Sequence, residues 1–194
     1  DGVEIDGVKN AYSDRLDGDF VCVARLLGEK GLRELHAAIV EVKKSDPDFS
    51  VKLYGPMESS PDAISEQEVK QWAECGTILW KGYSDDVKGV LKEAACFVLP
   101  SYHEGMSTAV AEAMAEGVPV IGTDISGIRE LVDGNGFLVA PKNYPDLAQA
   151  IHKFISLSDD KKIEMSEVGI SRADMLCNRR VIMNRIKELV LEKQ

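Results

Sequence analysis

Features that would point to membranes, secretion or nucleic acids are missing from this sequence. No apolar run approaches the roughly 18 residues that a membrane-spanning helix needs, and the polar start is unlike a signal peptide. Basic residues are few, with 23 Lys and Arg against 33 Asp and Glu and a net charge of −10. Such a chain has little general attraction for nucleic acid or anionic lipid. A phosphate-bearing ligand would therefore need a local cluster of basic groups.

Two familiar phosphate-binding motifs are also absent. There is no Gly-x-Gly-x-x-Gly and no Gly-Lys-Ser/Thr, which disfavours NAD binding and P-loop chemistry. The four cysteines, Cys22, Cys75, Cys96 and Cys177, show neither a pairing pattern nor metal-ligand spacing. They are typical of reduced, mostly buried thiols in a cytosolic protein.

What remains is the pattern of an α/β domain. Short apolar runs of strand length alternate with helical segments, and each connection is long enough for a crossover. We therefore predict a Rossmann-like, doubly wound parallel sheet of about six strands with helices on both faces. The expected strands are 20–24, 51–56, 77–83, 96–99, 119–122 and 134–139. The expected helices are 32–44, one that starts at 65, 85–94, 107–116, 126–132, 144–158, 160–177 and 179–193.

The chain divides into two unequal parts. Residues 1–18 are polar and glycine-containing without a sustained period, and are interpreted as a linker. Residues 19–194 form one domain, which includes the C-terminal helices. Because the chain also begins without Met, it is interpreted as a piece of a longer protein.

The loops after the strands gather chemically useful residues at one edge of the predicted sheet. Arg25 and Lys30 flank a glycine-containing loop after the first strand, where doubly wound folds bind phosphates. Arg binds a diphosphate with two bonds and Lys adds a point charge. Gly55, Tyr83 and Glu104 follow three other strands and fall on the same edge.

Two carboxylates mark the stretch after the fourth strand. Glu104 lies in the loop before the Ala-rich helix and Glu112 lies on that helix, so that both can face one ligand. Gly105 allows close approach of a ligand, and the free N–H groups of 106–109 would form an anion site at the helix N-terminus. Taken alone, the two carboxylates are better explained as a solvated loop acid and a partly exposed helix acid.

A longer motif reverses that balance. Glu104-Gly-Met-Ser, then Ala111-Glu-Ala-Met-Ala-Glu-Gly-Val-Pro-Val-Ile-Gly-Thr-Asp and Gly127-Ile-Arg-Glu-Leu-Val, resembles the donor-site signature of glycosyltransferase family 4. These are retaining enzymes of the GT-B fold that use nucleotide sugars. The resemblance implies that the chain is one half of such an enzyme, its C-terminal nucleotide-sugar-binding domain. The spacing is most similar to bacterial enzymes of capsule, O-antigen and lipid-linked glycan synthesis.

The resemblance also assigns roles to individual residues. Arg25 and Lys30 would hold the donor diphosphate, and the backbone at Gly82 and Tyr83 would lie against the base. Glu104, the expected catalytic residue, would orient the sugar hydroxyls, and Glu112 would bind the ribose. The helix N-terminus would bind phosphate or sugar through Gly105, Met106, Ser107 and Thr108. No metal and no cofactor is expected beyond the donor.

The expected function is therefore transfer of a hexose or N-acetylhexosamine from a nucleotide sugar, UDP-linked by the narrower similarity, to a glycan or lipid-linked acceptor. The acceptor would bind a missing N-terminal domain, which would also make any membrane contact, so this chain alone should be inactive and cytoplasmic. Three alternatives remain open: a sugar phosphorylase, a nucleotide-sugar epimerase or hydrolase on the same fold, and a nucleotide-binding module without catalysis.

Overall fold

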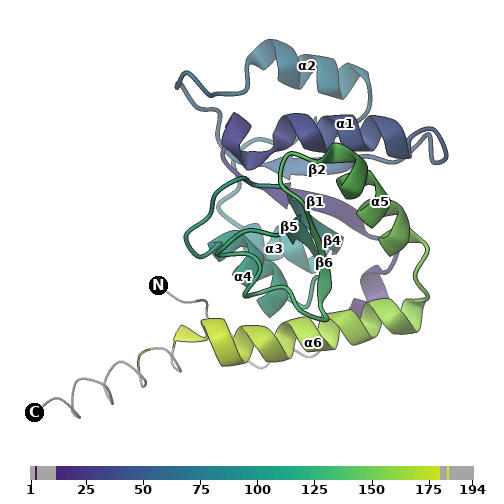
Figure 1. The fold of residues 1–194 in the computed structure, drawn as a ribbon, viewed down its shortest axis with the longest axis vertical. Coiled ribbons are helices and arrows are strands. Elements are labelled where there is room, and N and C mark those ends of the chain that lie inside the picture. Colours follow the sequence, from purple (N-terminus) through teal and green to yellow (C-terminus); the bar gives the residue numbers. More distant parts are fainter. Residues whose placement is uncertain (1–2, 4–11, 180–182, 184–194) are drawn as a thin grey trace, which may run out of the picture.

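The structure is a computed structural model that describes residue 3, residues 12–179 and residue 183 of the chain. Six parallel strands form one sheet in the order β3-β2-β1-β4-β5-β6 (Figure 1). Because the strand order reverses between β1 and β4, the sheet is the doubly wound, Rossmann-like arrangement that the sequence predicts. The strands are β1 (Asp19–Val23), β2 (Val51–Tyr54), β3 (Ile78–Trp80), β4 (Ala94–Leu99), β5 (Val120–Thr123) and β6 (Gly136–Val139).

Helices cover both faces of this sheet. Figure 1 shows α1 and α5 on one face and α3, α4 and the long α6 on the other. Two short 3-10 helices, Tyr12–Arg15 and Gly28–Lys30, precede β1 and α1. The α-helices are α1 (Leu32–Val42), α2 (Glu66–Glu74), α3 (Val87–Lys92), α4 (Thr108–Ala115), α5 (Tyr144–Ile155) and α6 (Asp159–Cys177).

The core follows from the position of each strand in the sheet. All six residues of the central strand β4 are buried, as are all four of β5. A strand covered by helices on both faces has no solvent-facing side, so it consists of apolar residues without alternation. The edge strands β3 and β6 are less buried. The apolar runs of the sequence therefore coincide with the strands of the sheet.

Local hydrogen bonds fix where the helices begin. The Ser107 hydroxyl accepts from the Val110 N–H at the start of α4. At the start of α2, Ser65 and Glu68 form the reciprocal capping box that their spacing predicts. Both helices therefore begin at the polar residues that the sequence suggested.

The carboxyl ends of β1 to β4 lie close together, as expected. The Gly55 N–H, just after β2, donates to the Gly82 carbonyl after β3 over 2.9 Å. Gly55 has φ of +152°, and a Cβ at this position would lie 1.8 Å from the Ala24 carbonyl oxygen. Only glycine fits here, because the loops after β1 and β2 pass in direct contact.

Two expected elements differ from the structure. The predicted helix 126–132 is wrong, since this segment forms a series of turns. Gly127 has φ of +87°, which interrupts a right-handed helix. Residues 12–15, assigned to the linker, form a 3-10 helix whose Tyr12 is fully buried. The predicted helix 179–193 lies almost entirely outside the described residues.

Candidate nucleotide-sugar site

Lys30 and Glu104, which the sequence places on two different loops, are in contact. The Lys30 ammonium Nζ lies 2.9 Å from Glu104 Oε1, and each side chain is only 14% exposed. Lys30 follows β1 and Glu104 follows β4, the two strands on either side of the point where the strand order reverses. Ligands of doubly wound folds bind at this crevice. The pair therefore marks the centre of the candidate site.

Neighbouring loops hold the backbone beside Lys30 from two sides. The Asp62 carboxylate accepts the Glu29 N–H over 2.7 Å, and the Asp62 carbonyl accepts the Gly28 N–H over 2.8 Å. On the other side, the Tyr102 N–H donates to the Glu29 carbonyl over 2.8 Å. The residue preceding Lys30 is therefore fixed through both its N–H and its C=O.

A buried thiol lies beneath this pair. Cys22 on β1 is fully buried, and burial raises the pKa of its thiol to about 12. The nearby Lys30 ammonium lowers this pKa and the Glu104 carboxylate raises it, both to a smaller extent than burial. Cys22 is therefore a neutral packing residue at neutral pH and not a nucleophile.

Arg25, the second predicted phosphate-binding residue, extends into solvent. Its Nη1 lies 3.5 Å from Glu58 Oε1, and its side chain is 57% exposed. A guanidinium held only by an exposed ion pair is free to turn toward a ligand, because such pairs are weak. The structure brings Arg25 and Lys30 to the same edge of the sheet without a contact between them.

The loop before α4 is held from the opposite side by Gly127. The Ser107 N–H donates to the Gly127 carbonyl over 3.2 Å. A Cβ on Gly127 would lie 2.0 Å from the Gly105 carbonyl oxygen and 2.8 Å from that of Glu104. Met106, which lies between Gly105 and Ser107 in the sequence, is 47% exposed. The backbone after β4 is thus fixed while Met106 faces solvent.

Glu112 and Thr108 lie one turn apart on α4 and line a cavity of about 340 Å³. Lys88 and Leu91 of α3 and Glu116 at the end of α4 line it too. Burial raises the pKa of the Glu112 carboxyl above its usual value. A carboxylate that is half-buried beside a cavity is suited to accept hydrogen bonds from hydroxyl groups.

Gly82 and Tyr83 follow β3 at the same edge of the sheet. Gly82 has φ of +82°, and nothing lies within 4 Å of a Cβ at this position. The Tyr83 ring is 73% exposed. The turn is therefore open to solvent, with a flat aromatic surface beside it.

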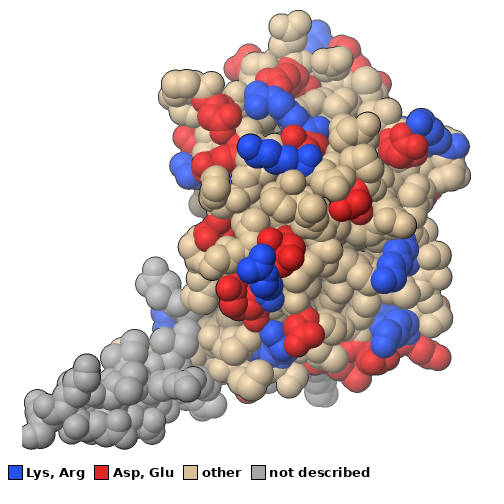
Figure 2. Space-filling model, viewed as in Figure 1, with Lys and Arg blue, Asp and Glu red and all other residues tan. Residues whose placement is uncertain are grey.

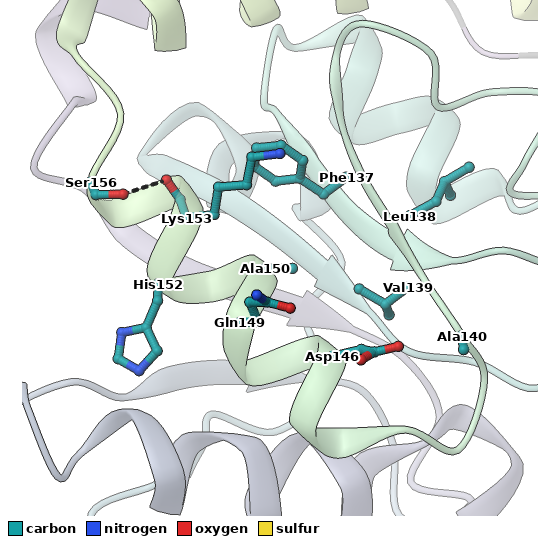
Figure 3. Close-up of a pocket in the computed structure, with 10 residues that line it drawn as sticks. All are labelled: Phe137, Leu138, Val139, Ala140, Asp146, Gln149, Ala150, His152, Lys153 and Ser156. Atoms are coloured by element: carbon teal, nitrogen blue, oxygen red, sulfur yellow. Dashed lines mark hydrogen bonds between the residues drawn. The ribbon is translucent and has the colours of Figure 1, made fainter.

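A hollow larger than the cavity beside Glu112 lies elsewhere and contains none of the predicted site residues. It measures about 870 Å³ and lies between the edge strand β6 and α5, with Phe137 and Lys153 near one end and His152 pointing outward (Figure 3). The Lys153 ammonium lies 4.4 Å from the centre of the Phe137 ring. This hollow is therefore separate from the candidate site.

Charge is mixed on the face that Figure 2 shows, and no metal site is evident in the described part of the chain. Figure 2 shows acidic and basic side chains interspersed on this face. Among the described residues, no group of three or more His, Cys, Asp or Glu could hold a metal ion. Within the same residues, no helix is both long enough and apolar enough to span a bilayer.

Three residues near the site were not predicted as part of it: Asp62, Lys88 and Gly127. Their positions depend on contacts between segments far apart in the sequence. Only Gly127 carried a signal, because it lies in the motif that extends the resemblance.

Comparison with known proteins decides the family. A family model described as group 1 glycosyl transferases matches residues 17–156. The chain belongs to this family. The matched region contains every predicted site residue and all six strands. The predicted resemblance to a glycosyltransferase family is thereby confirmed.

Two bacterial relatives place this glycosyltransferase chain more closely. It is 30% identical over 184 residues to WcaL of Escherichia coli K12, assigned as a colanic acid biosynthesis glycosyltransferase, covering 89% of this chain and 44% of that protein. It is 27% identical to the N,N'-diacetylbacillosaminyl-diphospho-undecaprenol alpha-1,3-N-acetylgalactosaminyltransferase of Campylobacter jejuni, covering 79% of this chain and 39% of that one. The chain thus spans less than half the length of these relatives.

A solved structure shares the fold of the whole glycosyltransferase chain. Anabaena Alr3699/HepE, solved in complex with UDP, matches with a TM-score of 0.82 at 22% identity. The match covers 98% of this chain and 56% of that chain. The Rossmann-like domain of this family therefore accounts for nearly all of the described residues.

Proposed function

We propose that this chain is the donor-binding domain of a retaining glycosyltransferase. In this proposal it binds a UDP-linked hexose or N-acetylhexosamine, which is transferred to a glycan or lipid-linked acceptor. The observation that carries the proposal is the contact between Lys30 and Glu104 at the crevice where the strand order reverses. The Lys30 ammonium can bind phosphate, and the adjacent Glu104 carboxylate can accept hydrogen bonds from hydroxyl groups. Together they match the diphosphate and the sugar of a nucleotide sugar.

Each residue has a defined role in this proposal. Lys30 and Arg25 neutralise the diphosphate, so that negative charge growing on the leaving group is stabilised as the bond from the anomeric carbon to phosphate oxygen breaks. Glu104 orients the sugar hydroxyls, and Glu112 accepts a hydrogen bond from the ribose. The acceptor oxygen forms its new bond on the same face of the sugar as the departing diphosphate, whose oxygen takes the acceptor's proton, and this retains the anomeric configuration.

The proposal has support from the relatives at the level of substrate class. One relative is named for transfer to an undecaprenol-linked sugar, and one shared fold was solved with UDP. Because the chain spans less than half the length of the Escherichia coli and Campylobacter jejuni relatives, we propose that the acceptor binds to a further domain. We expect the 194 residues alone to bind donor without transferring sugar to an acceptor.

A thermal-shift titration with UDP, GDP, ADP and UDP-sugars tests the donor site. A ligand at 100 times its dissociation constant stabilises the folded state by about 2.7 kcal/mol, and each kcal/mol moves the melting midpoint by about 2–4 °C in a domain of this size. We expect one nucleotide to raise the midpoint, and Lys30→Ala, Arg25→Ala and Glu112→Ala each to reduce that rise.

The control is His152→Ala, in the hollow between β6 and α5, which should respond as the unaltered chain does. Equal shifts for His152→Ala and Lys30→Ala would place the nucleotide elsewhere. Sugar release that depends on inorganic phosphate would indicate a phosphorylase instead.

A further inference from the structure

The pair between Lys30 and Glu104 differs from the other ion pairs of the molecule. Among the ion pairs between described residues, it alone has both side chains less than a fifth exposed. Charges that are shielded from water and salt interact strongly. A ligand that binds to Lys30 or to Glu104 therefore changes the electrostatic energy of the other residue.

A diphosphate bound at Lys30 would feel this neighbour directly. Its negative charge would lie beside the Glu104 carboxylate, which also occupies one of the three N–H donors of Lys30. Like charges that lie side by side repel, and the Lys30 ammonium would be shared between the diphosphate and the Glu104 carboxylate. Glu104 therefore opposes the binding of a nucleoside diphosphate alone.

A sugar attached to the diphosphate changes this balance. Sugar hydroxyls donate hydrogen bonds to a carboxylate, and hydrogen bonds to an ionised acceptor are stronger than those between neutral groups. Gly105 leaves room for the sugar, because a Cβ at that position would meet nothing within 4 Å. The repulsion is therefore offset for the nucleotide sugar and not for the free nucleotide.

We propose that Glu104 makes the site discriminate between donor and product by competing with the diphosphate for Lys30. The nucleoside diphosphate left after transfer would bind more weakly than the nucleotide sugar and would leave the site. This inference rests on the proposed function, and it gives Glu104 a specificity role in addition to its contact with the sugar.

The test is isothermal titration calorimetry of this chain with UDP and with UDP-N-acetylglucosamine. Glu104→Gln keeps the shape of the side chain and removes its charge. We expect it to bind UDP about threefold or more tightly than the unaltered chain, a change that lies within the usual coupling between residues in contact. The preference for the UDP-sugar over UDP should fall, and Lys30→Ala should weaken the binding of both ligands.

Glu58→Gln is the matched control. Glu58 pairs with Arg25, the other predicted phosphate-binding residue, but this pair is exposed. We expect its UDP affinity to change by less than about twofold. An equal gain in UDP affinity for Glu58→Gln and Glu104→Gln would show that the effect comes from the change in net charge, and would overturn the inference.

Other outcomes are equally decisive. Unchanged or weaker UDP binding by Glu104→Gln overturns the inference while the proposed function stands. An unaltered chain that binds neither ligand overturns both. Glu104→Ala, which also lacks the charge, provides the same comparison if Glu104→Gln folds poorly by circular dichroism.

Discussion

Glu112 illustrates a conflict between stability and binding at the scale of one residue. Because burial raises the pKa of its carboxyl, the folded chain holds this proton more tightly than the unfolded chain. Stability therefore falls as pH rises from about 4.5, the usual value, through the raised value, and the loss is complete above it. At neutral pH the ionised carboxylate destabilises the fold.

Glu112→Gln should therefore be more stable than the unaltered chain at pH 7 and equal to it below pH 4.5. We expect a rise in melting midpoint of up to about 2 °C, because a half-exposed group contributes less than 1 kcal/mol. The same substitution should weaken UDP binding about tenfold, since hydrogen bonds to charged groups are worth about 1.5–3 kcal/mol. Melting curves at both pH values and calorimetry measure the two effects.

Glu167→Gln, at an exposed position on α6, provides the comparison for net charge. If it stabilises the chain as much as Glu112→Gln does, the effect does not come from burial.

Gly127→Ala should displace the loop that carries Glu104. The added methyl group would lie 2.0 Å from the Gly105 carbonyl oxygen, and the backbone at Gly127 is left-handed. We expect a loss of about 1–3 kcal/mol in the free energy of unfolding together with weaker UDP binding. Urea denaturation tests the stability, and Gly134→Ala, with φ of +78° and no contact closer than 3.3 Å, separates backbone strain from the contact with Gly105. Normal UDP binding by Gly127→Ala would contradict the predicted position of the loop.

The sequence predicts which residues form the candidate site, but it does not predict the contacts between them. Lys30 and Glu104 were assigned to phosphate and sugar by resemblance, and the structure shows that they touch across 74 positions of sequence. Asp62 was not predicted, because its role depends on how the connection between β2 and α2 passes over Glu29. Periodicity and caps describe neighbours along the chain, whereas these contacts depend on the assembled sheet.

At the scale of elements, the start of α2 was predictable from the capping box of Ser65 and Glu68. The same Glu68 carboxylate also makes the stability of the chain depend on pH. The hydrogen bond from Arg33, with further bonds from Ser65, lowers the pKa of Glu68 to about 2. Since the usual value is 4.5, the stability that ionised Glu68 contributes is fully present above pH 4.5 and is lost as pH falls toward 2.

Glu68→Ala should destabilise the chain at pH 7 by about 1 kcal/mol, a typical value for a helix cap. Glu68→Gln keeps a side chain that can complete the capping box, so its smaller loss isolates the charge. Urea denaturation at pH 7 and at pH 4 measures both. The difference between Glu68→Gln and the unaltered chain should shrink at pH 4, and a constant difference would rule out the ionic contribution.

The failed element has an equally local cause. Residues 126–132 have a helix-like pattern, but Gly127 adopts a left-handed conformation where it contacts the loop after β4. Glu130 accepts the Gly127 N–H over 2.7 Å, which stabilises a turn instead. A tertiary contact thus overrides the local preference.

At the scale of the whole molecule, residues before β1 belong to the packing of the domain. The Tyr12 hydroxyl donates to the Ala95 carbonyl over 2.6 Å, and Arg15 donates to the carbonyls of Leu91 and Glu116 at the ends of α3 and α4. These two helices form the walls of the cavity beside Glu112. Composition described this segment as linker because one buried aromatic residue leaves no periodic signal.

Tyr12→Phe should lower the free energy of unfolding by about 1–3 kcal/mol, the usual loss when a buried carbonyl loses its partner. Each kcal/mol corresponds to about 2–4 °C in the melting midpoint. Tyr144→Phe, on an exposed ring, is the comparison and should change little. An unchanged midpoint for Tyr12→Phe would show that the hydroxyl is replaceable by water.

The distribution of cysteines has a practical consequence. Cys22, Cys96 and Cys177 are buried, whereas Cys75 is exposed at the end of α2 opposite to the end that begins near the site. A maleimide dye added under native conditions should therefore attach to Cys75 first. The three remaining thiols would react only as the fold opens, so the rate at which further dye attaches reports how often the buried core is exposed.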